Sequence, residues 1–211
     1  MKFLFFFASI ISICGCKQHM QVHLTRIQEL KYSAYCMRLN ASKDSFVFYL
    51  DHYINIDKNG DFTAMKHADW TSKPAYFKGF VNDSIAKEID STFSKSNYQQ
   101  TYYPNDAVMY DGLDYSLDIR LNGDSNKLIR FIPNYSPKQI LDLSTTLDVL
   151  IYSGQAQQID SFNLDAYKEI LRKYYPAPPR LVKAKVFSRK KKQFWGDLYI
   201  LKSPNFISTI L

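Results

Sequence analysis

Residues 46–56 read Phe46-Val-Phe-Tyr-Leu-Asp-His-Tyr-Ile-Asn-Ile56, a run of aromatic and β-branched side chains that is typical of a β-strand. The turn-forming residues Asp57-Lys-Asn59-Gly60-Asp61 follow, and residues 62–66 can return as a second strand. An Asn-Gly pair readily adopts positive φ at both central positions of a type I′ turn. We therefore predict a β-hairpin around Asn59 and Gly60.

A helix is predicted after a third strand at residues 75–81. The polar residues 82–84 can cap its N-terminus. Ile85, Ile89 and Phe93 recur every four residues, which places them on one helical face. This part of the chain therefore reads as a hairpin, a strand and a helix.

A similar order recurs further along the chain. Strands are predicted at 115–121 and 127–132, on either side of a second Asn-Gly-Asp turn that begins at Asn122. A helix follows, for which Ser136 and Gln139 fit a capping box. Its predicted apolar face consists of Ile140, Leu143, Leu147, Leu150 and Ile151.

The remaining segments complete one domain. Residues 27–39 fit a helix or a strand by their apolar spacing, and we favour a strand. A third helix is predicted at 164–174, and strands at 180–188 and 194–201 would form a C-terminal hairpin.

The fold class follows from how these units bury their apolar surfaces. One hairpin and helix cannot cover both of their apolar faces, so the two units should share a core. We predict an α+β domain with a mainly antiparallel sheet, helices packed on one side and two imperfect hairpin–helix units. The domain would span 27–211, with the two units in 27–151 and the C-terminal helix and basic hairpin in 152–211.

The order of strand, Asn-Gly turn, strands and helix, followed by Tyr115-Ser-Leu-Asp-Ile-Arg-Leu-Asn-Gly, resembles an uncharacterised domain found in bacterial lipoproteins. The resemblance covers residues 27–151 and implies the fold, because that family has no agreed activity. Its members often carry a pair of cysteines before the first hairpin. Only Cys36 corresponds here, and residues 43–46 lack the second cysteine.

The N-terminus predicts export and lipid anchoring. Lys2 precedes an apolar run over residues 3–13, which has the length of a signal peptide and is too short for a permanent membrane span. Ile13-Cys14-Gly15-Cys16 resembles a lipobox, which implies that residues 1–15 are removed and that Cys16 is diacylated. The alternative is an ordinary signal peptide. Residues 16–26 would form a tether, and the absence of acidic residues in 17–23 favours an outer membrane position facing the periplasm.

Composition and charge limit the function classes. The chain is 46% hydrophobic and 22% charged, which is typical of a globular protein. Without Lys2 it retains 26 Lys and Arg against 20 Asp and Glu, a net charge of +6. An exported protein rarely meets nucleic acid, so we expect no nucleic-acid partner. We expect Cys36 to pack in the core.

No motif for a cofactor or a metal is recognised, so neither is predicted. Asp57, Asn59 and Asp61 begin like a calcium loop, but Phe62 occupies the position where that loop needs glycine. His52 alternates with its neighbours on a predicted strand, so we expect it to face solvent or a cross-strand partner.

Two surface segments are candidate binding sites. One is a loop with side chains suited to sugar or peptide, for which the other interpretation is a polar connection. The other is a basic segment suited to an anionic surface, for which the other interpretation is a solvated hairpin tip. The loop candidates are Tyr102, Tyr103, Asp106, Tyr110 and Asp111, and the basic candidates are Arg189, Lys190, Lys191 and Lys192.

The leading interpretation is a non-enzymatic lipoprotein, anchored in the bacterial cell envelope, that binds or scaffolds a protein or an anionic envelope component. The alternative is a hydrolase that acts on envelope carbohydrate or peptide through the loop carboxylates. A third possibility is a protein that protects the cell from an exported toxin. The sequence holds no catalytic frame that favours an enzyme.

Overall fold

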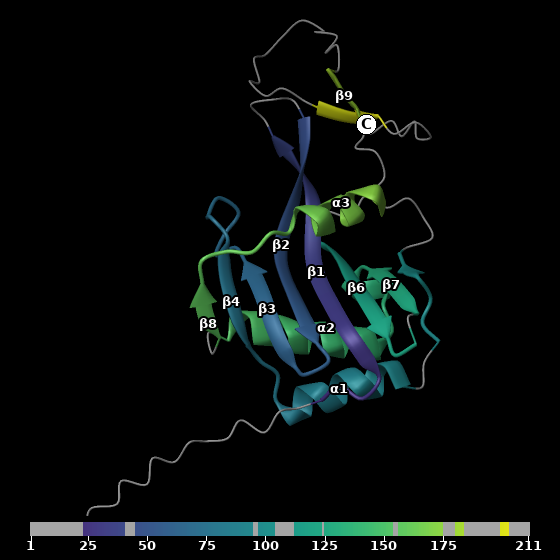
Figure 1. Ribbon diagram of the computed structural model, residues 1–211. Coiled ribbons are helices and arrows are strands. Elements are labelled where there is room, and N and C mark those ends of the chain that lie inside the picture. The colour runs from purple at the N-terminus through teal and green to yellow at the C-terminus, as the bar shows by residue number, and fades with distance from the viewer. Residues whose placement is uncertain are drawn as a thin grey trace, which may run out of the picture.

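The computed structural model describes residues 23–40, 45–94, 97–103, 112–123, 125–153, 156–174, 180–183 and 199–202. Eight strands of this part form one sheet (Figure 1). Their bounds are β1 (Ile27–Asn40), β2 (Ser45–Asp57), β3 (Asp61–Lys66), β4 (Ala75–Phe80), β5 (Thr101–Tyr102), β6 (Asp114–Leu121), β7 (Asn126–Phe131) and β8 (Gln157–Ile159). The order across the sheet is β5-β7-β6-β1-β2-β3-β4-β8, and every pairing is antiparallel except that of β5 with β7.

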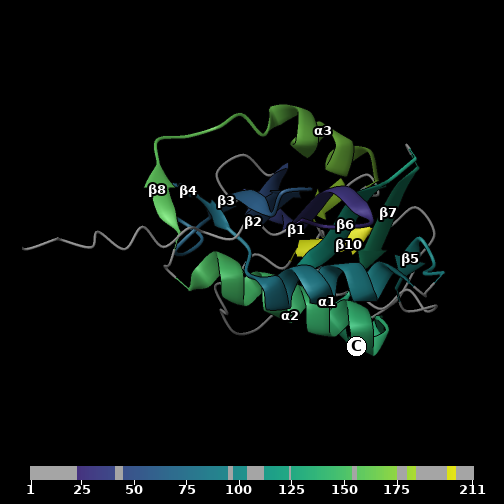
Figure 2. The same cartoon turned by 60° about the horizontal axis from the view of Figure 1, so that its bottom comes forward.

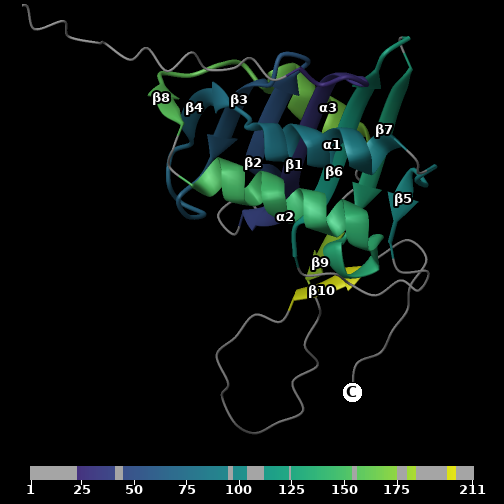
Figure 3. The same ribbon diagram turned by 90° about the horizontal axis from the view of Figure 1, so that it is seen from below.

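Three α-helices of the described residues cover the sheet in two layers. They are α1 (Asp83–Ser94), α2 (Lys138–Tyr152) and α3 (Asp165–Tyr174), and a short 3-10 helix, η1 (Pro133–Tyr135), precedes α2. Figure 2 shows α1 and α2 beneath the sheet and α3 above it, and Figure 3 shows α1 and α2 side by side across the strands. The α+β class and the mainly antiparallel sheet are therefore confirmed.

The main core lies between the sheet and the helices α1 and α2. Ile54 and Ile56 of β2 are fully buried there against Ile89 of α1 and Leu143 and Leu147 of α2. Burying one such side chain stabilises a fold by about 1.5–3 kcal/mol. The helical faces predicted from apolar spacing are thus the faces that form this core.

The third helix differs from the expected arrangement because it packs on the opposite face. Tyr167 and Leu171 of α3 contact Tyr53 and Met65 of the sheet in a second cluster of buried residues. Around Tyr53 and Met65 both faces of the central strands carry apolar side chains, so the sheet needs a helix on each side.

The two hairpin–helix units are present, and their turns need glycine. Gly60 and Gly123 have φ values of 78° and 93°, which L side chains rarely adopt. The first turn is not the predicted type I′, because Gly60 N–H donates to the Asp57 carbonyl and makes Lys58 and Asn59 the central pair. A three-residue loop with a left-handed glycine at its end results.

The predicted cap of α1 is confirmed, and that of α2 is wrong. Asn82 Oδ1 accepts a hydrogen bond from the backbone N–H of Ile85 at 3.0 Å. At α2 the N-cap position is Pro137, and Ser136 Oγ donates instead to the Pro133 carbonyl in η1. The preceding 3-10 turn therefore takes the hydroxyl that the capping box would use.

The folded domain begins before residue 26, the position at which the tether is predicted to end. Leu24 is buried in the main core, and its N–H donates to the Lys58 carbonyl at 2.8 Å. Thr25 N–H and Oγ1 both donate to Asp90 Oδ2 on α1, at 2.8 and 2.7 Å. The expected strand over 27–39 is confirmed as β1, and Cys36 is buried within it.

At the C-terminus, β9 (Arg180–Lys183) pairs antiparallel with β10 (Tyr199–Lys202), as the predicted hairpin requires. None of the described helices is long and apolar enough to span a membrane.

Candidate functional site

Part of one sheet face is left without a described helix, and we call it the open face. Below α3 in Figure 1 the strands β1, β2, β3 and β4 are bare. The row of cross-strand neighbours beneath α3 includes Ser33, Tyr53, Met65 and Tyr76. Two residues further along each strand, side chains point to the same face but have no helix above them.

The first uncovered row consists of polar side chains on six adjacent strands. Directly paired residues of neighbouring strands face the same side of a sheet. The pairing therefore aligns Asp118, Lys31, Asn55, Thr63, Lys78 and Gln157. A second row aligns Arg120, Glu29, Asp57, Asp61 and Phe80 beside it.

The open face carries charges of both signs, and they are partly paired. Lys31 Nζ lies 3.0 Å from Glu29 Oε2, and Arg120 Nη2 lies 3.8 Å from the same oxygen. Partial burial raises the pKa of Asp118, while the charge of Lys31 lowers it and that of Glu29 raises it. A ligand that binds here must therefore meet both acidic and basic groups.

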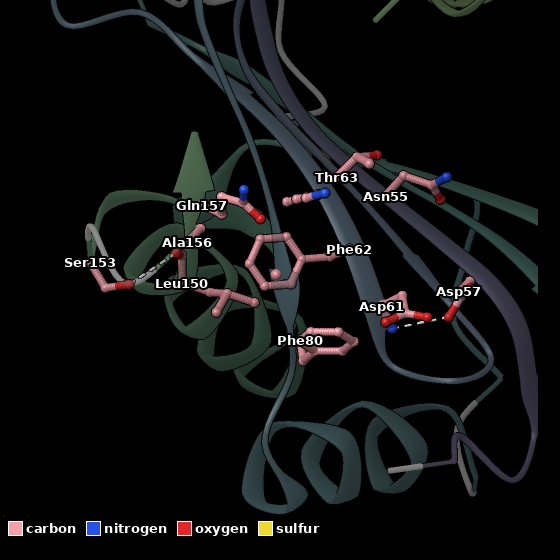
Figure 4. A pocket seen from close by; sticks show the side chains of 12 residues that line it. Asn55, Asp57, Asp61, Phe62, Thr63, Phe80, Leu150, Ser153, Ala156 and Gln157 are labelled. Atoms are coloured by element: carbon pink, nitrogen blue, oxygen red, sulfur yellow. Dashed lines mark hydrogen bonds between the residues drawn. The ribbon is translucent and has the colours of Figure 1, made fainter. Parts of the chain in front are cut away.

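A groove of about 700 Å³ lies at the β2–β3–β4 end of the open face (Figure 4). Asn55, Thr63 and Lys78 line its polar side, and Phe62 and Leu150 line the side towards α2. Such a mixture of apolar walls and a few polar groups is typical of binding sites.

One polar atom of this groove has no partner among the described residues. Asn55 Oδ1 is buried and accepts no hydrogen bond. A buried acceptor of this kind costs about 1–3 kcal/mol unless a donor satisfies it. The Asn55 amide is therefore the group in the groove most suited to receive a donor from a ligand.

The shape of the groove depends on a glycine. A Cβ atom at Gly79 would lie 2.7 Å from Cζ of Phe62, which is too close for any side chain. The Phe62 ring therefore occupies the space above the Gly79 backbone, and this position of the ring requires glycine at residue 79.

A smaller hollow of about 310 Å³ lies on the same face beside α3. Asp118, Arg130 and Ile170 are among its lining residues. Because Asp118 also belongs to the polar row, the open face is hollowed on both sides of β1.

A cluster of a buried histidine and two partly buried carboxylates joins β2 to α2 on the other face. A bulge in β2 leaves Asp51 without a partner in β1, because Ala34 pairs with His52 and Tyr35 pairs with Leu50. Such a bulge turns two consecutive side chains to one side. Asp51 and His52 therefore both point towards α2, where Asp148 lies.

His52 contacts both carboxylates. Its Nδ1 lies 2.9 Å from Asp51 Oδ2, and its Nε2 lies 2.9 Å from Asp148 Oδ1. Tyr32 donates a hydrogen bond to the same Asp148 oxygen at 2.8 Å. Burial lowers the pKa of His52, but the two carboxylates outweigh burial and raise that pKa above its usual value. His52 does not face solvent, because it lies on the same side of β2 as Ile54 and is buried there. The expected cross-strand contact is present, since the His52 ring centroid lies 5.6 Å from that of Tyr32 on β1.

The predicted loop site is only partly described. Tyr102 is half-buried in β5, where its hydroxyl accepts the backbone N–H of Gln99 at 2.9 Å. Tyr103 is half-buried beside Tyr35 and Asp114, and burial is the main cause that raises its pKa. Asp106, Tyr110 and Asp111 lie outside the described residues, as do Cys16, Arg189, Lys190, Lys191 and Lys192.

Sequence reasoning missed the open face and the His52 cluster for one reason. Both depend on the register between strands that lie far apart in the chain, and no local pattern encodes it. A signal was available in β2, where Tyr53, Asn55 and Asp57 alternate with apolar residues and become more polar towards the turn.

The described residues include no group of three or more His, Cys, Asp or Glu side chains placed to hold a metal ion. A scan against protein-family models found no match for this chain, and a search of curated proteins found none either.

Proposed function

We propose that this protein is a non-enzymatic lipoprotein of the bacterial cell envelope that binds a partner polypeptide on its open face. The observation that carries this proposal is the pair of uncovered rows, polar apart from Phe80, that cross the sheet beside the groove at Asn55. The part of the face without a described helix presents aligned polar side chains beside a groove, and such a surface is suited to recognition.

Mixed charge favours a polypeptide over a uniform polyanion. Lys31 and Lys78 can pair with acidic side chains, and Asp57 and Asp61 can pair with basic ones. The unpartnered Asn55 Oδ1 can accept an N–H of the partner. A polyanion would meet repulsion from the carboxylates of the same surface.

A diacylated Cys16 would hold this surface at the envelope. Each buried methylene contributes about 0.8 kcal/mol, and two acyl chains exceed the marginal binding of one. In this proposal the anchor lies in the outer membrane, and the domain faces the periplasm. The basic residues 189–192 would contact anionic headgroups.

Photo-crosslinking in intact cells tests the proposal with the full-length lipidated protein. A crosslinkable amino acid at Thr63, within the first polar row, should produce one discrete protein adduct. The same amino acid at Ser84, which is exposed on α1, serves as the matched control and should not. Equal labelling from both positions would contradict a partner on the open face.

Charge reversal adds a second control to that experiment. Lys78→Glu should reduce the Thr63 adduct, whereas Lys87→Glu on the exposed side of α1 should leave it unchanged. Both substitutions alter one exposed lysine, so their difference reports the position of the charge and not the net charge.

A hydrolase acting on envelope carbohydrate or peptide is the alternative, and one observation favours it. Asp118 has a raised pKa and interacts with Glu29, and two carboxylates in such environments can serve as acid and base. This alternative predicts that the purified protein releases soluble fragments from envelope material and that Asp118→Asn abolishes the release. Release that survives Asp118→Asn and Glu29→Gln would exclude these residues as the source.

A further inference from the structure

An exposed aromatic platform lies at the opposite end of β3 from the groove, and we call it the Trp70 platform. The rings of Trp70 and Tyr49 are parallel to within 3°, with their centroids 5.8 Å apart. The Arg38 guanidinium lies over both rings, 3.8 Å from the Trp70 centroid and 4.7 Å from that of Tyr49. Despite these contacts Trp70 remains 54% exposed.

The loop that carries Trp70 is held in one conformation by its own hydrogen bonds. Asp69 Oδ1 accepts bonds from the backbone N–H groups of Thr71 and Ser72, at 2.7 and 2.8 Å. Ser72 Oγ in turn accepts those of Ala68 and Asp69. Arg38 Nη1 donates to the Trp70 carbonyl at 3.0 Å and ties this loop to β1. The indole is therefore positioned before any ligand arrives.

The charge of Arg38 is not neutralised within the described part of the chain. Its contacts there are the Trp70 carbonyl and two aromatic faces, and none of them is a carboxylate ion pair. Asp69, the nearest acidic residue in the loop, uses its carboxylate to accept the N–H groups of the turn, and these bonds lower its pKa. The platform thus combines a flat apolar surface with an available positive charge.

The geometry points to a second binding site, in which the Trp70 platform binds a carboxylated sugar. The C–H face of a pyranose ring stacks on an exposed indole, and a guanidinium binds a carboxylate through directed hydrogen bonds. A neutral sugar would use only the ring, and a simple anion would use only Arg38. A sugar acid uses both, and it is the ligand class that fits all three side chains.

This site is separate from the polypeptide surface proposed above. Trp70 follows β3 at its C-terminal end, whereas Asp57 and Asp61 lie at the turn before β3. The two proposals can therefore fail independently, since a variant of one site leaves the other intact.

Tryptophan fluorescence tests the inference directly. The chain has two tryptophans, so a Trp195→Phe background leaves Trp70 as the reporter. Hexagalacturonate should shift the Trp70 emission and saturate, and the neutral hexamer maltohexaose should bind at least about tenfold more weakly. If the two hexamers bind equally, or if neither binds, the inference is overturned.

Substitutions separate the stacking from the charge, with binding measured by calorimetry. Trp70→Ala should abolish binding of hexagalacturonate, and Arg38→Gln should remove the preference over maltohexaose. Phe80→Ala is the matched control, because it removes an aromatic ring that is 58% exposed at the other end of the sheet. Binding that persists in Trp70→Ala, or that is lost equally in Phe80→Ala, would contradict the assignment to the platform. Circular dichroism of each variant is the control that tests whether the fold is retained.

Discussion

His52 Nε2 on β2 lies 2.9 Å from Asp148 Oδ1 on α2, and this contact joins the sheet to its longest described helix. The His52 Nε2–Asp148 Oδ1 contact does not have the geometry of a hydrogen bond, so we treat it as an ion pair. Asp51 binds the other ring nitrogen, and the His52 side chain is only 4% exposed. When the imidazole is protonated, its positive charge balances two carboxylates at the sheet–helix boundary.

The stability of the domain should fall as the pH rises through the neutral range. The pKa of His52 is raised in the folded state, so folding favours its protonated form. This contribution is complete below a pH of about 6.5, the value for an unfolded histidine, and it is lost as the pH rises through the raised pKa. Urea unfolding between pH 5.5 and 9, about the range that brackets this transition, measures the change.

His52→Gln is the variant that isolates this effect. It should lower stability by about 1–3 kcal/mol at pH 6, because Asp51 and Asp148 lose their charged partner, and it should flatten the pH dependence. His67→Gln is the control, since His67 Nδ1 contacts the Ser72 carbonyl and His67 forms no ion pair with a carboxylate among the described residues. A pH profile that is unchanged in His52→Gln would show that another group titrates.

Gly79→Ala should destabilise the domain through one steric contact. The new methyl would lie 2.7 Å from Phe62 Cζ, and such overpacking costs about 1–3 kcal/mol. Phe62→Leu shortens the opposing side chain, so the double variant should recover part of the loss in thermal unfolding. Gly123→Ala provides the contrast, because its cost comes from a φ of 93° and Phe62→Leu should not relieve it.

Local patterns were sufficient to predict the elements that build the main core. The spacing of Ile85 and Ile89 predicted the buried face of α1, and the aromatic and β-branched run in 46–56 predicted β2, because each pattern depends on residues within one element. The capping error at Ser136 is of a different kind. Two local structures compete for one hydroxyl there, and the 3-10 turn before α2 takes it.

The candidate sites could not be predicted, because they arise between elements. The bulge at Asp51 places that carboxylate on the same side of β2 as His52, and strict alternation cannot reveal an unpaired residue. Trp70 and Arg38 are 32 residues apart, and the pairing of β1 with β2 and of β2 with β3 brings their loop and strand together. Register between distant strands is a property of the whole sheet.

Cys16→Ser should leave an unprocessed precursor without acyl chains. The lipobox needs a cysteine thiol at the acylation position, and serine cannot replace it. Metabolic labelling with palmitate and the mass of the intact chain measure both steps. Cys14→Ser is the matched control, because serine suits that small-residue position and should permit normal processing. Palmitate incorporation into the Cys16→Ser protein would contradict the lipid anchor.

The basic segment should bind anionic membranes independently of the acyl chains. Arg189, Lys190, Lys191 and Lys192 follow one another without an acidic residue, and each can contribute about 1 kcal/mol near an anionic surface. Protein that begins at Lys17 should co-sediment with phosphatidylglycerol vesicles, and replacement of all four residues by Gln should release it.

The control removes equal charge from exposed positions elsewhere, as the quadruple Gln variant of Lys73, Lys78, Lys87 and Lys138. Because screening weakens surface electrostatics, binding should also fall between about 0.05 and 0.5 M salt. If both quadruple variants lose binding equally, net charge explains the attraction and the segment has no specific membrane role.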